Sequence, residues 1–212
     1  MKPSSKKLDL RTLFMNYSVY IVLIVLLAYF SIANGDFLST YNIENFLQQV
    51  PPVGILTVAY TMILICGYVD LSIGYVGMAA GMLGLYVANH GVPAPFVLVI
   101  VLATGAILGT MNALLIKKFD LPSFILTLGS SYVIKGMLGF FTNEQFIGSD
   151  KEWYNALATT PIIGDILKSN ALIFVAVIVI FAFVMKNTRF GKYTYAVGSN
   201  PEAARLSGID TD

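Results

Sequence analysis

The sequence predicts an all-α fold, a polytopic bundle of about six transmembrane helices with a cytoplasmic N-terminus. Hydrophobic residues make up 57% of the 212 residues and charged residues only 12%, whereas about a quarter of the residues in a soluble domain are charged. Six apolar runs follow one another along the chain, with lengths close to that of a bilayer crossing. A net charge of +1, with no basic polar domain, argues against a nucleic-acid partner and leaves the lipid bilayer as the environment.

The transmembrane domain, residues 17–185, follows a cytoplasmic tail of residues 1–16. Its six predicted spans are 17–33, 46–65, 71–87, 96–116, 121–141 and 171–185. The first run could also be a signal peptide, but its long polar lead and the later apolar runs favour a transmembrane helix. A polar outer loop, 142–170, holds Trp153, which is typical of an anchor at the membrane interface and, alternatively, of a platform that stacks on a sugar.

Residues 53–88 are too long for one transmembrane helix. A single helix here would measure about 54 Å, at about 1.5 Å per residue, and it would hold one charged side chain, Asp70. We therefore expect a break at Gly67, with Asp70 or Ser72 capping the helix that follows. Whether Asp70 then lies in a simple turn or in a broken helix that re-enters the membrane stays open.

Glycines and prolines mark special backbone positions in the spans. Pro51 and Pro52 free backbone carbonyls inside the second span, so that stretch must lie near a helix end or pack against protein. Two sets of glycines recur at helical spacing and predict faces where another helix can approach closely. These predicted packing residues are Gly74, Gly77, Gly81, Gly84, Gly105 and Gly109.

Basic residues orient the chain in the membrane. If the N-terminus is inside, the inner segments hold ten basic residues and the outer segments two. The inner ten are Lys2, Lys6, Lys7, Arg11, Lys117, Lys118, Lys186, Arg189, Lys192 and Arg205, and the outer two are Lys151 and Lys168. Because cytoplasmic segments carry an excess of lysine and arginine, this asymmetry predicts a cytoplasmic N-terminus and a cytoplasmic segment after the sixth span.

Polar side chains inside the spans are candidates for a translocation path or a gate. An intramembrane carboxylate has a functional role by default, although Asp70 could equally be a helix cap. Hydroxyl and amide groups could bind a polar solute, but serine and threonine often bond to carbonyls of their own helix. The candidates for the path are Asp70, Ser72, Asn112, Thr127 and Ser130. His90 has no Cys, Asp or Glu at ligand spacing, so we predict no metal site and no cofactor.

A polar segment, residues 186–212, follows the sixth span and contains a short predicted helix, 200–208. Asn200 is a good N-cap, Pro201 suits the first helical position, and Glu202 favours the positive end of the helix dipole. Gly208 is a natural stop. A helix of about two turns is unstable alone in water, so it needs a docking surface. That surface could be a soluble partner or the membrane.

Four stretches of the sequence resemble motifs of one family. Glu202-Ala203-Ala204, followed three residues later by Gly208, is similar to the EAA-x3-G coupling motif of ABC importer permeases. GYVDLSIG at 67–74 resembles the G-x-[IVT]-DLS-x-G stretch of permeases of the ribose, xylose and galactose type. GTMNALLI at 109–116 and LPSFILTLG at 121–129 resemble two further motifs of that type, with Ala113 in place of the usual glycine.

This resemblance implies a permease subunit of a monosaccharide ABC importer in a bacterial inner membrane. The implied partners are a second permease copy, a cytoplasmic ATP-binding subunit and an extracytoplasmic sugar-binding protein. The residues that the motif assigns to coupling are Asn200, Pro201, Glu202, Ala203, Ala204, Arg205 and Gly208. The chain is not expected to be an enzyme, because Gly191-Lys192 lacks the rest of a phosphate-binding loop. Permeases of this kind continue through further spans, so the chain resembles the N-terminal two thirds of one.

Three other readings stay open. Nucleoside and branched-chain amino-acid permeases are related to the same family, although the DLS-x-G stretch favours sugars. A secondary transporter driven by an ion gradient would use Asp70 as its coupling carboxylate. An intramembrane enzyme would need paired catalytic groups in the spans, and one aspartate with one lysine supplies no such pair.

Overall fold

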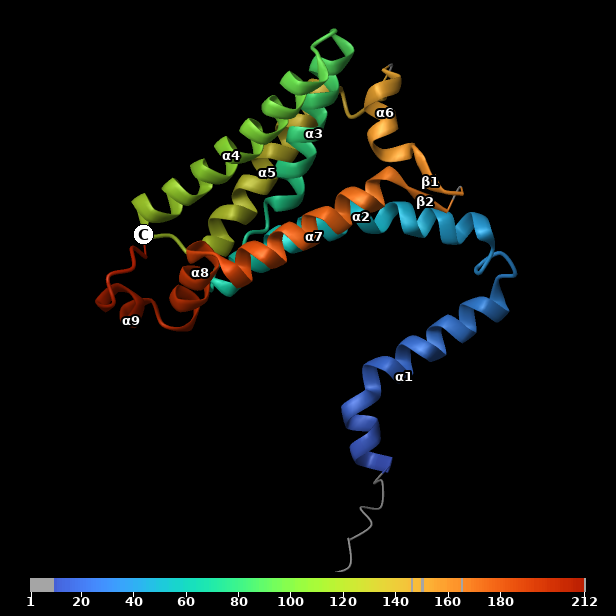
Figure 1. Ribbon diagram of the computed structural model, residues 1–212, viewed down its shortest axis with the longest axis horizontal. Helices are drawn as coiled ribbons and strands as arrows, with labels where there is room; N and C mark the ends of the chain where they lie inside the picture. The colour runs from blue at the N-terminus through green and yellow to red at the C-terminus, as the bar shows by residue number, and fades with distance from the viewer. Residues whose placement is uncertain (1–9, 146, 150, 165, 212) are drawn as a thin grey trace, which may run out of the picture. The chain divides into compact units, whose positions relative to one another are not determined.

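The computed structural model describes residues 10–145, 147–149, 151–164 and 166–211 of the chain, so residues 1–9 of the predicted tail lie outside the described part. The described residues are almost entirely helical, which confirms the all-α prediction (Figure 1). The elements are α1 (Leu10–Ala33), α2 (Thr40–Ile65), α3 (Ile73–Asn89), α4 (Ala94–Phe119), α5 (Ser123–Thr142), α6 (Glu152–Thr159), β1 (Pro161–Ile163), β2 (Leu167–Lys168), α7 (Ser169–Asn187), α8 (Arg189–Ser199) and α9 (Pro201–Leu206).

Four of the described helices, α2, α4, α5 and α7, are long and apolar enough to cross a membrane. The apolar part of α1, Tyr17–Ala33, and helix α3 are shorter. All six predicted spans are therefore helices, but α2 begins at Thr40 instead of residue 46. The chain divides into two compact units, Met1–Phe46 and Leu47–Asp212. Helix α1 lies in the first unit, and helices α3 to α9 lie in the second.

Helix α2 ends at the predicted break. The Gly67 amide donates to the Leu64 carbonyl (3.0 Å) and the Tyr68 amide to the Ile63 carbonyl (3.2 Å). Gly67 has φ +85°, a conformation that glycine adopts without strain. These features form a Schellman motif and confirm the predicted helix end. The predicted cap by Ser72 is wrong, because its side chain accepts no hydrogen bond from the first turn of α3 and bonds Asp70 instead.

Helices α3, α4 and α5 pack closely in the second unit. A Cβ atom added to Gly84 would lie 2.5 Å from Cγ2 of Val101 on α4, so only glycine permits this approach. A Cβ on Gly77 would lie 3.3 Å from Cδ2 of Leu56 on α2. The other four predicted packing glycines, Gly74, Gly81, Gly105 and Gly109, have no described atom within 4 Å of an added Cβ. Their faces are open within this chain.

The two prolines of α2 are accommodated by contact with α7. Pro52 has no amide hydrogen, so it cannot donate to the carbonyl of Gln48, four residues earlier. The Asn170 side chain, in the first turn of α7, donates to that carbonyl instead, with an Nδ2 to O distance of 3.1 Å. One turn further along α7, the ring of Phe174 fills the space where a side chain on Gly54 would lie. Pro51 is buried and Pro52 is exposed, and α7 contacts the stretch around them, as expected.

The segment between α5 and α7 folds into helix α6 and a short β1–β2 hairpin, neither of which the sequence predicts. The Tyr154 hydroxyl donates to the Gly81 carbonyl on α3 (3.3 Å). The Ser169 hydroxyl donates to the carbonyls of Ala156 and Leu157 at the end of α6 (3.0 and 2.9 Å). Helix α6 is thus joined to the start of α7 and rests on α3.

We predict that Asn170→Ala lowers the stability of the chain by about 0.5–1.5 kcal/mol, because it removes the hydrogen bond to the half-buried Gln48 carbonyl. Asn187→Ala is the matched control, since the Asn187 amide bonds only the Phe183 carbonyl of its own helix near the surface. The measurement is the thermal unfolding midpoint of the detergent-solubilised protein. Equal midpoints for the two variants would contradict the role assigned to Asn170.

Candidate functional site

The segment between α2 and α3, residues 66–72, forms the centre of the first candidate site. Asp70 Oδ1 accepts hydrogen bonds from the Ser72 amide (2.7 Å) and the Ser72 hydroxyl (2.6 Å). This arrangement is an aspartate turn, in which a short side chain bonds the backbone two residues later. It folds the carboxylate of Asp70 back onto its own segment, and Ser72 is fully buried.

Helix α5 supplies two hydroxyl groups whose oxygens accept hydrogen bonds from backbone amides of this segment. The Val69 amide donates to Oγ of Ser123 (3.1 Å), and the Leu71 amide donates to Oγ1 of Thr127 (3.0 Å). Thr127 also donates to the Ser123 carbonyl of its own helix (2.8 Å). The Thr127 hydroxyl therefore both bonds back to its own helix and supports the break. Two amides that have no helical partner are thereby satisfied inside an apolar region.

Helix α4 contributes Asn112, which is only 3% exposed. Its Nδ2 donates to Oγ of Ser72 (2.9 Å), so a chain of hydrogen bonds runs from Asn112 through Ser72 to Asp70. Oδ1 of Asn112 is buried and has no partner among the described residues. An unsatisfied buried acceptor costs about 1–3 kcal/mol, and Oδ1 of Asn170 on α7 is a second such atom among the described residues.

Four of the five predicted path residues thus come together, and one does not. Asp70, Ser72, Asn112 and Thr127 belong to the same set of hydrogen bonds. Ser130 lies one turn beyond Thr127 on α5, half-buried, outside this set. Ser123, another hydroxyl residue of the fifth predicted span, also belongs to the set. The signal was available, because Ser123 and Thr127 are four residues apart and lie on one face of a helix.

The second candidate site is the segment after α7. Oδ1 of Asn200 accepts the Ala203 amide (3.0 Å), and Pro201 is the first helical residue of α9, as the sequence predicts. The Gly208 and Ile209 amides donate to the carbonyls of Arg205 and Ala204, and Gly208 has φ +80°. Helix α9 is therefore closed at both ends. It is shorter than the predicted 200–208, because Ser207 and Gly208 form its C-terminal cap.

The motif residues of α9 divide into a buried and an exposed set. Ala204 is buried, which explains its small side chain, whereas Glu202, Ala203 and Arg205 are exposed. Leu206 is 83% exposed. A helix of six residues with an exposed leucine between charged groups presents a shaped surface and no reactive group.

Helix α8, which the sequence does not predict, joins α9 to the membrane helices. Oγ1 of Thr188 accepts the Gly191 amide (3.3 Å) and donates to the Val184 carbonyl (2.7 Å), which fixes the corner between α7 and α8. At its other end, a Cβ on Gly198 would overlap the carbonyl oxygen of Ile65, the last residue of α2. Helix α8 therefore lies directly against the start of the break.

The described inner segments meet at one end of the second unit. Figure 1 shows α8, α9, the end of α4 and the α2–α3 connection at that end, with α6 and the hairpin at the other. Lys117 and Lys118 end α4, and Lys186 ends α7. The basic residues that end α4 and α7 thus lie at the same end of the second unit, as the predicted topology requires.

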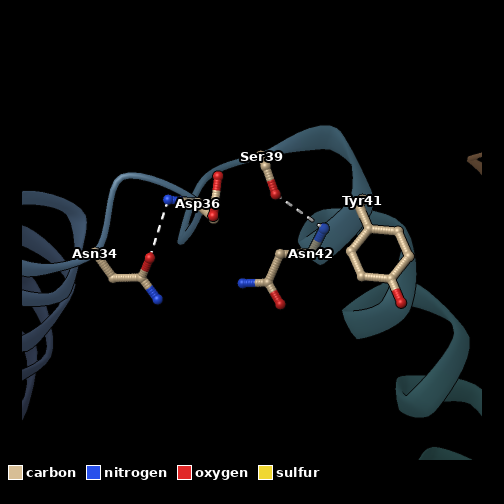
Figure 2. A pocket seen from close by; sticks show the side chains of 5 residues that line it. All are labelled: Asn34, Asp36, Ser39, Tyr41 and Asn42. Carbon is tan, nitrogen blue, oxygen red and sulfur yellow. Dashed lines mark hydrogen bonds between the residues drawn. The ribbon is translucent and has the colours of Figure 1, made fainter.

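A third feature is a polar hollow within the first unit. It is lined by Asn34, Asp36, Ser39, Tyr41 and Asn42, as Figure 2 shows. Its hydrogen bonds are local: the Asp36 amide donates to Asn34 (3.0 Å) and the Asn42 amide to Oγ of Ser39 (3.3 Å), which caps α2. These contacts build the connection between α1 and α2. Across the described residues, no group of three or more His, Cys, Asp or Glu side chains could hold a metal ion.

Comparison with known proteins finds import permeases of several sugars among the similar proteins. The fructose import permease protein FrcC of Rhizobium meliloti is 29% identical over 90% of this chain and 55% of its own length. The ribose import permease protein RbsC of Haemophilus influenzae is 27% identical over 100% and 66%. The galactose/methyl galactoside import permease protein MglC of Escherichia coli is 30% identical over 91% and 62%. No solved structure matches the chain.

The chain thus spans between half and two thirds of the length of these relatives. The model of one family, described as the branched-chain amino acid transport system / permease component, matches residues 42–212. That region includes the α2–α3 break with its supporting helices, and the α8–α9 segment. The chain is a multi-pass membrane protein that belongs to the family of the branched-chain amino acid transport system permease component.

Proposed function

We propose that this chain is part of the permease subunit of an ATP-driven importer of a monosaccharide. The observation that carries the proposal is helix α9, a capped helix with an exposed leucine and exposed charges that follows the last described span. Such a helix is suited to docking in a groove of another protein and is too short to be stable alone. The similarity to import permeases supplies the rest of the argument.

The substrate class follows from the relatives. Their names cover fructose, ribose, galactose with methyl galactoside, and xylose, which apart from the methyl galactoside are monosaccharides. The family description mentions branched-chain amino acids, but these relatives along most of the chain are sugar permeases. A sugar is therefore favoured over an amino acid. A secondary transporter driven by an ion gradient is not favoured either.

The partners of the importer would occupy different surfaces. A cytoplasmic ATP-binding subunit would hold α9, and an extracytoplasmic sugar-binding protein would meet the outer segment with α6. A second permease copy would pack against open small-residue faces of α3 and α4, where close approach of helices is favoured in lipid. The glycines on these faces are Gly74, Gly81, Gly105 and Gly109. This arrangement places the N-terminus in the cytoplasm and the protein in a bacterial inner membrane.

The segment 66–72 would act as a gate beside the translocation path. It is non-helical, it carries the Asp70 carboxylate, and side chains from α4 and α5 hold it. The unpaired Oδ1 of Asn112 favours this role, because a second state of the segment could provide the missing donor. Ser130 would line the path one turn further along α5. Closure of the ATP-binding subunits would move α9 and shift the segment between its states.

The whole proposal predicts that the full permease copurifies with an ATP-binding subunit and a sugar-binding protein in mild detergent. Proteoliposomes containing the assembly should accumulate at least one of radiolabelled ribose, xylose, galactose or fructose, and uptake should require ATP. Radiolabelled leucine and adenosine are the controls for the related permease classes. Uptake that continues without ATP but collapses with an ionophore would replace this proposal with an ion-driven transporter.

The docking role of α9 predicts that Glu202→Lys and Gly208→Val each reduce sugar uptake at least tenfold. The first reverses a charge at the positive end of α9, and the second places a branched side chain at φ +80°. Protein levels in the membrane should stay close to wild type. Asp36→Lys is the matched control, since Asp36 is exposed between α1 and α2, outside the surfaces assigned to partners. Undiminished uptake by both variants would remove the coupling role of α9.

The gate predicts that Asn112→Leu lowers uptake at least tenfold while the unfolding midpoint stays within a few degrees of wild type. Leucine is similar in volume and removes the unsatisfied acceptor, which offsets the loss of the hydrogen bond to Ser72. Asn187→Leu, at an exposed position of α7, is the control. If the unfolding midpoint falls strongly while uptake per folded protein stays normal, Asn112 stabilises the structure and has no role in the gate.

A further inference from the structure

Helix α8 touches the membrane helices through a backbone contact at Gly198. An added Cβ at this position would overlap the carbonyl oxygen of Ile65 and would lie 2.8 Å from its carbonyl carbon and 3.5 Å from Cα of Cys66. These are backbone atoms, so no side-chain rotation can relieve the overlap. Gly198 itself is exposed to solvent on its other side. The absence of a side chain therefore serves the approach to α2 and no other described contact.

The point of contact is the place where the break begins. Ile65 is the last residue of α2, and the amides of Cys66, Gly67 and Tyr68 fold back onto the carbonyls of residues 62–64. Asp70 follows two residues after Tyr68. A displacement of the Ile65 carbonyl thus acts directly on the segment held by Ser123, Thr127 and Asn112.

On the other side, α8 is tied closely to α9. One residue, Asn200, separates the two helices. Its amide donates to the Ala196 carbonyl of α8 (3.1 Å), and its own carbonyl accepts the Ala204 amide of α9 (3.0 Å). Tyr195 of α8 also lines a groove with residues of α2 and α7, including Thr61 and Met185. A force on α9 is therefore transmitted to α8 with little room for independent bending.

We propose that Gly198 is a positioning residue that transmits movement of α9 to the 66–72 segment, with α8 and the end of α2 moving as one body. The proposal rests on the function proposed above, since it assigns a route between the docking helix and the gate. Gly198 lies outside the motif residues that the sequence predicts for either site. It also requires that the Gly198–Ile65 contact persists through the transport cycle.

The test compares Gly198→Ala with Gly136→Ala in the full transporter with its ATP-binding subunit and binding protein. Gly136 is a helical glycine of α5 whose added Cβ meets no described atom within 4 Å, so both variants add one methyl group to a helix. The readouts are assembly, ATP hydrolysis, ATP-dependent uptake of radiolabelled ribose, xylose, galactose and fructose, and the alkylation rate of Cys66 by N-ethylmaleimide. Cys66 is the only cysteine of the 212 residues given and is half-buried, so its labelling, measured on the peptide that contains it, reports on the contact.

We expect Gly198→Ala to assemble and hydrolyse ATP, to raise Cys66 labelling several-fold, and to lower uptake per ATP hydrolysed at least tenfold. Gly136→Ala should match wild type in all four readouts. Raised labelling with unchanged uptake per ATP would overturn the transmission role, and unchanged labelling would overturn the contact itself. The proposed function fails separately, if the wild-type assembly shows no ATP-dependent uptake of any of the four sugars.

A second measurement tests whether the contact persists. Val197→Cys and Ser199→Cys, flanking Gly198, are each combined with native Cys66 and treated with a short bismaleimide in the presence of ATP with vanadate, and without nucleotide. Tyr193→Cys, on the exposed part of α8, is the control. We expect cross-linking from at least one flanking position in both nucleotide states, with sugar uptake retained. Cross-linking in only one nucleotide state would overturn the proposal that α8 and the end of α2 move as one body. Loss of uptake upon cross-linking would overturn it as well.

Discussion

The structure depends on one constraint: a peptide group in an apolar region needs a hydrogen-bond partner from the protein, because lipid offers none. The 66–72 segment meets this constraint through side chains of other helices. Ser123 and Thr127 accept its amides, and the Asp70 carboxylate accepts the Ser72 amide. The segment can therefore stay non-helical within the bundle. Its side-chain hydrogen bonds to other helices go to α4 and α5.

At Pro52 the backbone group that lacks its partner is a carbonyl and not an amide. Here a carbonyl loses its amide donor, and Asn170 of α7 supplies one. The contact joins the outer part of α2 to the beginning of α7, while Gly198 of α8 lies against the other end of α2. The continuous segment α7–α8 thus contacts α2 at Gln48 and at its last residue, Ile65. The break at Gly67 lies just beyond the inner contact, where α2 is no longer supported by α7.

The sequence predicts those features that depend on a residue's own backbone and its near neighbours. The apolar runs give the spans, Gly67 gives the break, and Asn200 with Gly208 gives the ends of α9. The partners of the break are not predictable in this way, because Asn112 lies 40 residues from Ser72 and pairs with it only through packing. Helix α8 is missed because its glycines and β-branched or aromatic residues are weak helix formers. Packing against α7 and α9 stabilises it instead.

Several glycines shape the described inner end of the chain, and each does so through the backbone. Gly67 and Gly208 adopt positive φ to end α2 and α9, and Gly198 allows α8 to touch the Ile65 carbonyl. A chemical mechanism needs reactive side chains at fixed positions, whereas transmission of movement needs close and stiff contacts between helices. The described inner end has contacts of the second kind. In the function proposed above, such contacts would convert a displacement at the surface of α9 into a rearrangement around Asp70, with the energy supplied by another protein.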